Sequence, residues 1–408
     1  MNTKTRPARN FSFFARACGG KAAGTVRPAA VRLSAYVLCA ITAAGLLFSC
    51  QQSPVFADLE QATPPVDTAI EGTPGRIVVS TGGVPFVSNG RIYQFSFLRN
   101  PGLGWKEIPG QPPGKRVQSI AVTGGFLYAQ VSTSGKLADD KLYRTALALA
   151  DPPQWDEVTG AGGAISAIFG AGDTLFIGMA NETIRYIQDT ASSPVNYGQT
   201  GLLLAAEKMG SAYFTSIRGK GLFYSAASPG AMPAQVAGTD GKSFMGFAFG
   251  PTSGAPTILY AAGGSSVAVI QAATPSTAAV KDYSGYNFTG ALTRWENTTH
   301  NVLLAGRRYS GSYTHGYVEI ALDPAGTTPG DIDGNCPVTL GDDKVRARYG
   351  ASLGRRVINH FTWVPIWESA SSTTTPSADR EIFASTNLYG LWRYSEQEGE
   401  WKEEDRRN

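Results

Sequence analysis

Oxygen-bearing residues recur at alternating positions between Gly330 and Asp342, in the segment Gly-Asp-Ile-Asp-Gly-Asn-Cys-Pro-Val-Thr-Leu-Gly-Asp. Oxygen ligands at alternating positions of one short loop are what Ca²⁺ requires. The oxygens would come from five side chains and one backbone carbonyl, namely those of Asp331, Asp333, Asn335, Thr339, Asp342 and Pro337. The segment raises the hypothesis of a calcium loop, and Ca²⁺ is the one cofactor that the sequence suggests.

The spacing resembles the EF-hand loop, and Val338 and Tyr349 add a resemblance to the calcium loops of dockerin modules. The resemblance implies that these six positions hold the ion. Two positions depart from the pattern, because Cys336 replaces the glycine of the sharp turn and Asp342 is shorter than the glutamate that usually closes the loop. The alternative, which these departures favour, is a polar turn within a long loop.

The N-terminal segment combines positive charge with a short apolar run. Residues 1–49 contain seven Lys or Arg and no Asp or Glu, and their apolar run from Ala35 to Phe48 has 14 residues. A membrane-spanning helix needs ~20 apolar residues, whereas a basic region before a shorter apolar run is typical of a secretory signal peptide. The chain is predicted to be exported. Val26 and Val31 are alternative starts that would shorten the basic region.

Cys50 follows this segment in the sequence Leu47-Phe48-Ser49-Cys50, which resembles the lipobox of bacterial lipoproteins. The resemblance implies cleavage before Cys50, acylation of the cysteine with fatty acids such as palmitate, and anchoring to a cell-envelope membrane. Two or more acyl chains hold a protein stably to a bilayer. Gln51, in place of an acidic residue, favours the outer membrane and leaves its periplasmic or surface face open. The alternative is an ordinary signal peptide cleaved near Ala57.

Charge and cysteine content exclude two further classes of protein. The leader holds seven of the 35 Lys and Arg residues and none of the 32 acidic ones, so residues 50–408 carry 28 basic against 32 acidic groups. Nucleic-acid binding therefore has no electrostatic support. Cys18 and Cys39 lie in the leader and Cys50 would be acylated, so Cys336 alone remains and no intrachain disulfide framework is available.

After a linker at 50–75 that is rich in breakers, residues 76–405 alternate runs of Val, Ile, Tyr, Phe and Thr with clusters of Gly, Pro, Asn and Asp, which predicts an all-β domain. An apolar or aromatic pair followed by small residues recurs at roughly 45-residue intervals. Its copies are Ile77-Val78, Leu127-Tyr128, Leu175-Phe176, Tyr213-Phe214, Leu259-Tyr260, Leu303-Leu304 and Ile382-Phe383.

This period is typical of a β-propeller with four strands in each blade. Seven copies predict seven blades, beginning near 76, 117, 164, 205, 243, 291 and 357, with an insertion near 322–356. The alternative is an eighth blade inside the longest interval. The sequence leaves open how the first and last blades close the ring.

The last repeats resemble bacterial propellers with Asp-box or quinoprotein-like repeats. Ser395 to Trp401 reads Ser-Glu-Gln-Glu-Gly-Glu-Trp, with Glu398 at the Asp position of an Asp box. Trp105, Trp155 and Trp401 recur in register near the ends of three units, which predicts packing between blades. The resemblance implies the fold and leaves the activity open.

We expect a non-enzymatic binding or scaffolding propeller for an envelope protein or a glycan, and no catalytic residue is assigned. Trp295, Trp363 and Trp367 fall outside the repeating register and are candidates for a binding surface. The alternative is a carbohydrate-active hydrolase or lyase at the channel mouth, for which Arg307-Arg308 and Arg355-Arg356 offer arginines. The three histidines, His300, His315 and His360, are scattered and predict no metal cluster.

Overall fold

Strands and tight turns alternate along the chain wherever the structure, a computed structural model, describes it. The described residues are 70, 72–96, 104–148, 152–250, 255–296, 301–308, 316–332, 357–365, 380–388, 390–395 and 400–404. They contain 27 strands and one turn of 3₁₀ helix, η1 (Leu137–Asp139). None of the helical structure in these ranges has the length and apolar character needed to cross a membrane.

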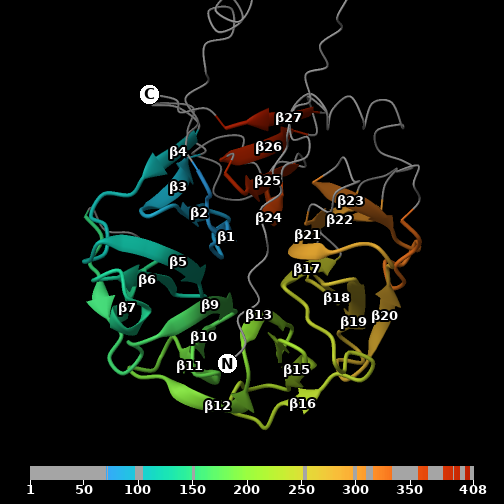
Figure 1. The fold of residues 1–408 in the computed structure, drawn as a ribbon, viewed down its shortest axis with the longest axis horizontal. Coiled ribbons are helices and arrows are strands. Elements are labelled where there is room, and N and C mark those ends of the chain that lie inside the picture. The colour runs from blue at the N-terminus through green and yellow to red at the C-terminus, as the bar shows by residue number, and fades with distance from the viewer. Residues whose placement is uncertain are drawn as a thin grey trace, which may run out of the picture. The chain divides into compact units, whose positions relative to one another are not determined.

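The strands form seven antiparallel sheets, each built from consecutive strands and arranged as the blades of a ring (Figure 1). Blade 1 consists of β1 (Val78–Val79), β2 (Pro85–Ser88), β3 (Ile92–Ser96) and β4 (Gly104–Glu107). Blade 2 consists of β5 (Arg116–Val122), β6 (Phe126–Ser132), β7 (Asp140–Ala146) and β8 (Asp156–Glu157). Blade 3 consists of β9 (Ile165–Ala171), β10 (Thr174–Met179), β11 (Thr183–Gln188) and β12 (Val195–Thr200). Blades 4 and 5 consist of β13 (Leu203–Met209), β14 (Ala212–Ile217), β15 (Gly221–Ser225) and β16 (Ala234–Gln235); and β17 (Gly246–Gly250), β18 (Ile258–Gly263), β19 (Ser266–Gln271) and β20 (Ala278–Asp282). Blades 6 and 7 consist of β21 (Phe288–Glu296), β22 (Asn301–Arg307) and β23 (Tyr317–Ala321); and β24 (Ile358–Pro365), β25 (Arg380–Thr386), β26 (Leu391–Ser395) and β27 (Glu400–Glu403).

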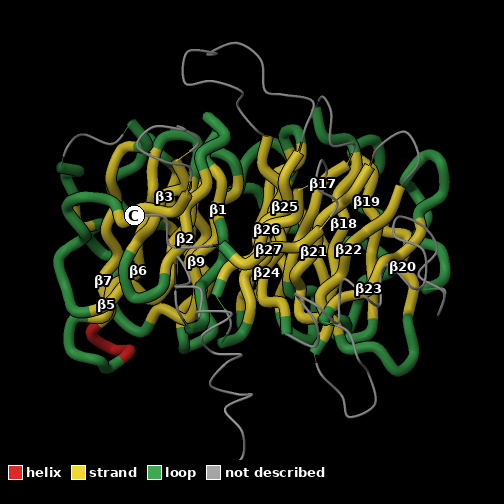
Figure 2. The backbone as a smooth tube through the Cα atoms, turned by 90° about the horizontal axis from the view of Figure 1, so that it is seen from above, coloured by secondary structure: helices red, strands yellow, loops and turns green. Residues whose placement is uncertain are grey.

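The prediction of a seven-bladed all-β propeller is confirmed. Six of the seven sheets have four strands each, and blade 6 has three within the described residues. The inner strands of successive blades contact one another around the whole ring, including β1 with β24. The tube view, seen from the edge of the ring, consists almost entirely of strands and loops, with η1 at one rim (Figure 2).

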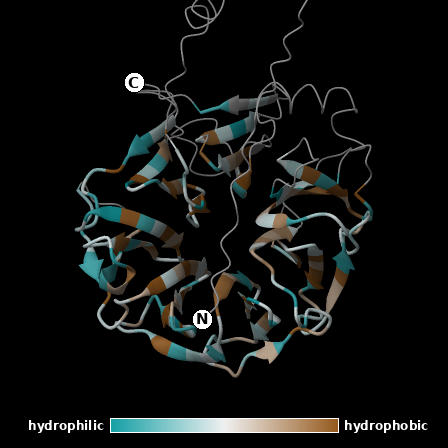
Figure 3. Cartoon of the chain, viewed as in Figure 1, coloured by the Kyte–Doolittle hydropathy of each residue, from teal (hydrophilic) through white to brown (hydrophobic). Residues whose placement is uncertain are grey.

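Burial falls from the second strand of each blade to the outermost one. Every residue of β10 and β18 is buried, whereas β12 has one buried residue, Tyr197, and β20 has none. The second strand lies between two neighbouring blades and is apolar on both faces, so it reads as a continuous apolar run. Figure 3 shows the same gradient, with hydrophilic positions gathering on the outer strands.

The repeated apolar pair marks this second strand in six of the seven blades, where it lies in β6, β10, β14, β18, β22 and β25. The prediction that Ile77-Val78 is the copy of this pair in the first blade was wrong. Ile77 precedes the innermost strand β1, in which Val78 is the first residue, and the equivalent pair is Phe86-Val87 in β2, exposed by only 2% and 0%. Both segments are short and apolar, so the pair alone did not separate an inner strand from a second strand.

The innermost strands carry a recurring irregularity in register. Each of β5, β9, β13 and β24 has one extra residue where it pairs with the second strand of its blade, namely Gln118, Ser166, Leu204 and Asn359. Such bulges bend a strand and re-aim the side chains that follow. In this ring the residues that follow include those that face the central channel.

Aromatic packing closes the ring between its first and last blades. Phe383 of β25 meets Phe95 of β3 and Trp105 of β4 with ring centroids 5.0 and 5.6 Å apart. Within the described residues blade 7 contains only its own consecutive strands, and no strand is exchanged between the two blades there. Closure depends on this cluster and on turn contacts such as Gly390 N to Gly72 O at 3.0 Å.

Small residues are needed where a second strand approaches the next blade. A Cβ at Gly306 would lie 2.7 Å from Ala291 Cβ and 3.1 Å from the Ile358 carbonyl oxygen. We therefore expect Gly306→Ala to lower the free energy of unfolding by about 1 to 2 kcal/mol, because overpacking forces the blades to shift. Urea unfolding measures this, with Gly82→Ala as control, since its nearest atom lies 3.8 Å away. Equal losses in both variants would contradict the close approach.

Candidate functional site

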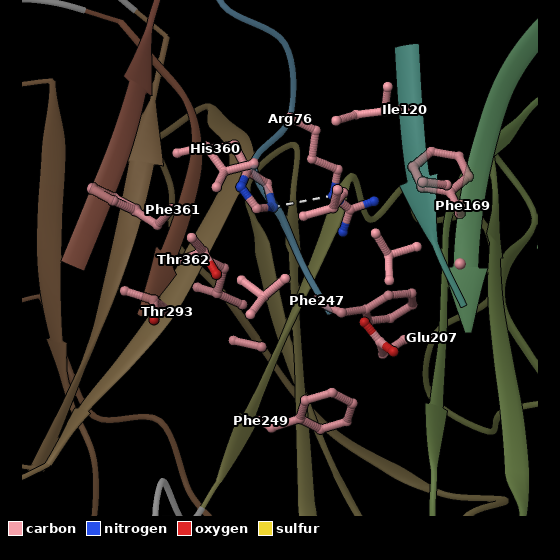
Figure 4. Close-up of a pocket in the computed structure, with 18 of the residues that line it drawn as sticks. Arg76, Ile120, Phe169, Glu207, Phe247, Phe249, Thr293, His360, Phe361 and Thr362 are labelled. Atoms are coloured by element: carbon pink, nitrogen blue, oxygen red, sulfur yellow. Dashed lines mark hydrogen bonds between the residues drawn. The ribbon is translucent and has the colours of Figure 1, made fainter. Parts of the chain in front are cut away.

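A cavity of about 310 Å³ occupies the centre of the ring and is lined by residues from, or directly before, the innermost strands of all seven blades. Most of its lining residues are apolar, but polar atoms contribute about half of its surface, and three ionisable side chains enter it: Arg76, Glu207 and His360 (Figure 4). Arg76 lies two residues before β1, Glu207 lies in β13 and His360 in β24. These charges come from three widely separated parts of the sequence and meet because the blades share one axis.

Arg76 and His360 are joined across the seam between the first and last blades. Arg76 Nε donates to His360 Nε2 over 3.1 Å. Burial, and then the charge of Arg76, lower the pKa of His360 well below its ordinary value of 6.5, so the ring is neutral at neutral pH. A neutral ring that accepts at Nε2 carries its proton on Nδ1. That Nδ1 is buried without a hydrogen-bond partner among the described residues.

The guanidinium of Arg76 stacks on an aromatic ring and keeps one edge unoccupied. Its central carbon lies 5.1 Å from the centroid of Phe169. Burial lowers the pKa of Arg76, while Glu207 opposes that shift, and an arginine stays protonated in proteins. Among the described residues only His360 bonds to this side chain, so its two terminal nitrogens offer donors to the cavity.

Glu207 places a carboxyl group in the same cavity, where few contacts offset the loss of water around it. Burial raises its pKa to about 7, and the positive charge of Arg76 opposes this rise only in part. One carboxyl oxygen accepts from the neighbouring Lys208 backbone N–H at 3.1 Å. No ion pair joins Glu207 to another side chain within the described residues. A carboxyl with this pKa is partly protonated at neutral pH.

Aromatic side chains form one wall of the cavity. Phe247 and Phe249 lie two residues apart in β17, and alternate residues of a strand share a face. With Phe169 they present three rings near Arg76 and Glu207 (Figure 4). Threonine side chains, Thr293 and Thr362, line the cavity from blades 6 and 7. The arrangement combines a cation, a titrating acid and an apolar surface suited to a small organic ligand.

A second cavity, of about 450 Å³, adjoins the first between blades 2 and 3 and shares Arg76 and Phe169 with it. Its polar groups are paired with one another. Gln130 donates to Asp140 at 2.7 Å and to the Ile165 carbonyl at 2.9 Å, and accepts from Ser119 at 2.8 Å.

Comparisons with known proteins find similarity at the level of solved structures only. No family model matches the chain, and no curated protein matches its sequence. The WD40 propeller domain of Doa1 aligns over 81% of this chain and 97% of its own length, with 8% identity and a TM-score of 0.48. A chain of the mitotic checkpoint complex aligns over 65% and 82% (12% identity, TM-score 0.47), and the computationally designed Ika8 protein over 83% and 91% (10% identity, TM-score 0.48).

Two of the three tryptophans proposed as a binding surface are described, and both are partly buried. Trp295 and Trp363 pack against one core cluster that spans blades 6 and 7. Trp295 also meets Tyr394 edge to face, with centroids 4.8 Å apart. Trp363 lines the central cavity, so it belongs to the candidate site. Trp367 lies outside the described residues, and the role of the three as a surface stays a prediction.

The repeating tryptophans contact neighbouring blades as expected. Trp105 meets Phe383 of blade 7, and Trp155 Nε1 donates to the Gly110 carbonyl in the connection between blades 1 and 2, at 2.7 Å. Trp401 of blade 7 donates to Tyr317 Oη of blade 6 at 3.0 Å. These residues hold blades together.

Of the predicted calcium loop, only Asp331 is described. Its carboxylate pairs with Lys281 Nζ at 2.6 Å and is 89% exposed. Within the described ranges no three His, Cys, Asp or Glu side chains gather as metal ligands. The other five positions, Asp333, Asn335, Pro337, Thr339 and Asp342, lie outside those ranges, as does Cys50, so calcium binding and lipidation both stay predictions.

Sequence reasoning missed the three ionisable residues of the cavity. Arg76 marked only the start of the domain, His360 was one of three scattered histidines, and Glu207 was not singled out. Of the arginines considered for a channel-mouth enzyme, Arg307 lies in the second strand β22 over the ring of Tyr286, and Arg355 and Arg356 lie outside the described residues. The available signal was a charged pair, Glu207 and Lys208, within an otherwise apolar first strand, as in Leu-Leu-Ala-Ala-Glu-Lys-Met of β13.

Proposed function

We propose that this chain is a lipid-anchored protein of the cell envelope, more specifically of the outer membrane, and that its propeller binds or scaffolds a protein or a glycan. The observation that carries the binding role is the pair of charged groups, Arg76 and Glu207, inside the central cavity without an ion pair. Burying such groups costs folding free energy. Groups of this kind with strongly shifted pKa values cluster at functional sites, and here a side chain or sugar ring of a partner would supply the missing contacts.

The composition of the cavity favours binding over glycoside hydrolysis. Glycosidases generally use two carboxyl groups on opposite sides of the scissile bond. Among the described residues that line the cavity, Glu207 is the only carboxylic acid. The cavity therefore offers one half of that machinery.

A lyase is the second candidate, because the Glu207 pKa of about 7 lies in the range where general acid and base catalysis is efficient. Arg76 would neutralise the carboxylate of a uronic acid while Glu207 removed the neighbouring proton; a carbon–carbon double bond would form as the glycosidic C–O bond broke, and the leaving oxygen would take up a proton from Glu207 or from water. Incubation with a polyuronate tests this role. New unsaturated ends, produced by the wild-type chain and not by Glu207→Gln, would favour the lyase over the binding protein.

The membrane anchor rests on Cys50 and on the basic and apolar segment before it. We expect the wild-type chain to fractionate with membranes and the Cys50→Ala variant to be released, because the acyl chains supply the membrane affinity. Mass spectrometry of the N-terminal peptide should show a lipid-modified Cys50. An unmodified N-terminus near Ala57 would contradict the proposal and support an ordinary signal peptide.

The partner is identified by cross-linking in the native cells, followed by mass spectrometry. The Cys50→Ala variant is the control, since it keeps the propeller and loses the anchor. Recovery of one abundant envelope protein or glycan with the anchored chain, and its loss in the control, would support the scaffold. Recovery of none from the anchored chain would count against it.

A further inference from the structure

The central cavity carries more positive than negative charge at neutral pH. Arg76 is permanently protonated, His360 is neutral because its pKa is lowered, and Glu207 is only partly ionised. The fixed charge of the guanidinium would repel a cationic ligand and attract an anionic one. The charge inventory therefore selects an anion.

The geometry around Arg76 fits a planar anion. His360 occupies the Nε edge at 3.1 Å and Phe169 stacks on the guanidinium plane at 5.1 Å, so these two contacts fix the side chain. The two terminal nitrogens are left, and a guanidinium fork binds both oxygens of one carboxylate. Arginine held in this way loses little side-chain entropy when it binds.

The rest of the cavity fits an apolar body. Phe247 and Phe249 flank the space next to Arg76 and Glu207 (Figure 4). The volume of about 310 Å³ is at the lower end of the range of small-molecule pockets. We propose that the central cavity binds a small organic carboxylate with a flat apolar body, whose carboxylate pairs with Arg76 and whose body lies against the phenylalanine rings. This proposal uses the same Arg76 and Glu207 that carry the binding role proposed above, but it names a free small carboxylate as the occupant of the cavity.

Glu207 gives this site a pH dependence. Its carboxyl faces Arg76 and His360 across the cavity, and the flanking strands β9 and β17 carry no titratable residue. The adjacent Lys208 is paired with Asp173 at 2.9 Å, and Tyr213 of β14 donates to the same carboxylate at 2.6 Å. An ionised Glu207 repels the bound anion, whereas the protonated acid does not. Affinity should therefore fall as pH rises through about 7.

Isothermal titration calorimetry of the purified full-length chain with benzoate tests the site, with uncharged benzamide as the matched probe. Benzoate should bind about five- to tenfold more tightly at pH 6 than at pH 8, because Glu207 titrates between these values. Benzamide should bind at least about tenfold more weakly than benzoate at pH 6, because it lacks the charge that Arg76 pairs with. The lipid anchor and any envelope partner play no part in this measurement.

Two variants and one control separate binding from misfolding. Arg76→Gln should weaken benzoate at least about tenfold, whereas Arg218→Gln, at an exposed arginine away from the cavity, should bind as the wild type does. Glu207→Gln keeps Arg76 and should bind benzoate equally at both pH values. The proposal is overturned if wild-type chain does not bind benzoate, if Arg76→Gln folds and binds it unchanged, or if the pH dependence persists in Glu207→Gln.

Discussion

Replacing Phe383 with alanine is expected to lower the free energy of unfolding by about 3 to 5 kcal/mol, the largest loss we anticipate from a single substitution. Phe383 is fully buried, and its ring meets those of both Phe95 and Trp105 of blade 1, in a core cluster that Leu391 of blade 7 joins. Among the strands that the structure describes, none is shared by these two blades, so loss of the phenylalanine ring removes packing from the seam itself. Chemical denaturation, followed by tryptophan fluorescence, measures the loss.

The location of the damage distinguishes a weakened seam from a general loss of core. Phe214→Ala is the matched control, because Phe214 holds the equivalent position in blade 4 and is equally buried. Hydrogen exchange should accelerate in β1 and β24 of the Phe383→Ala variant, and in β13 and β15 of the control. The same exchange pattern in both variants would mean that the seam carries no special share of the stability.

The number and position of the blades follow from the sequence because each second strand experiences the same environment. Tyr128, Phe176 and Phe214 are all fully buried, and each lies between two blades. Burial on both faces selects large apolar side chains at a constant point of every repeat, and the repeat length then counts the blades. The first blade broke the rule because Ile77 and Val78 form an apolar pair at its inner strand instead.

The site resisted prediction for a different physical reason. Arg76 and His360 are separated by 284 residues and touch only because the ring closes between them. The sequence left that closure open, so nothing placed the two side chains together. Each then looked like an isolated polar residue at a strand end. A sequence motif can be recognised only when its residues lie at short, regular spacings in the chain. The residues that line this channel come from seven separate strands and have no such spacing.

The predicted calcium loop is the opposite case. The spacing of its residues in the sequence suggests calcium binding, but the fold decides whether their oxygens can reach one ion. Asp331 is the first of the six positions and already pairs with Lys281 from β20. An ion at the loop would have to compete with that ammonium group for the carboxylate. The pair is exposed, where such contacts contribute little, so the pairing and the calcium hypothesis are compatible.

Glu207→Gln is expected to stabilise the protein above pH 7 and to do so less as the pH falls. Burial raises the pKa of Glu207 from 4.5 to about 7, so the folded state holds a proton that the unfolded state releases between these values. The stability that this proton provides is complete below about pH 4.5 and is lost as pH rises through 7. The difference in pKa corresponds to roughly 3 kcal/mol, which is an upper value because part of the side chain is accessible.

Glutamine has the shape of the protonated acid and never ionises, so the variant avoids this loss. Thermal unfolding of both proteins in carboxylate-free buffers should therefore give a gap in Tm at pH 8 that narrows towards pH 5. His360 acts in the opposite direction, because its lowered pKa makes the folded state lose stability as pH falls below 6.5, but it is present in both proteins and cancels in the comparison.

Glu182→Gln, at an exposed position, should leave the Tm difference near zero throughout. A gap that does not depend on pH would show that Glu207 ionises with an ordinary pKa, which requires water to reach its carboxyl freely. The pH dependence proposed for anion binding would then lose its physical basis, because the same proton is responsible for both effects. A gap that narrows as expected would mean that the cavity raises the free energy needed to ionise Glu207, and an anion bound to Arg76 would raise that free energy further.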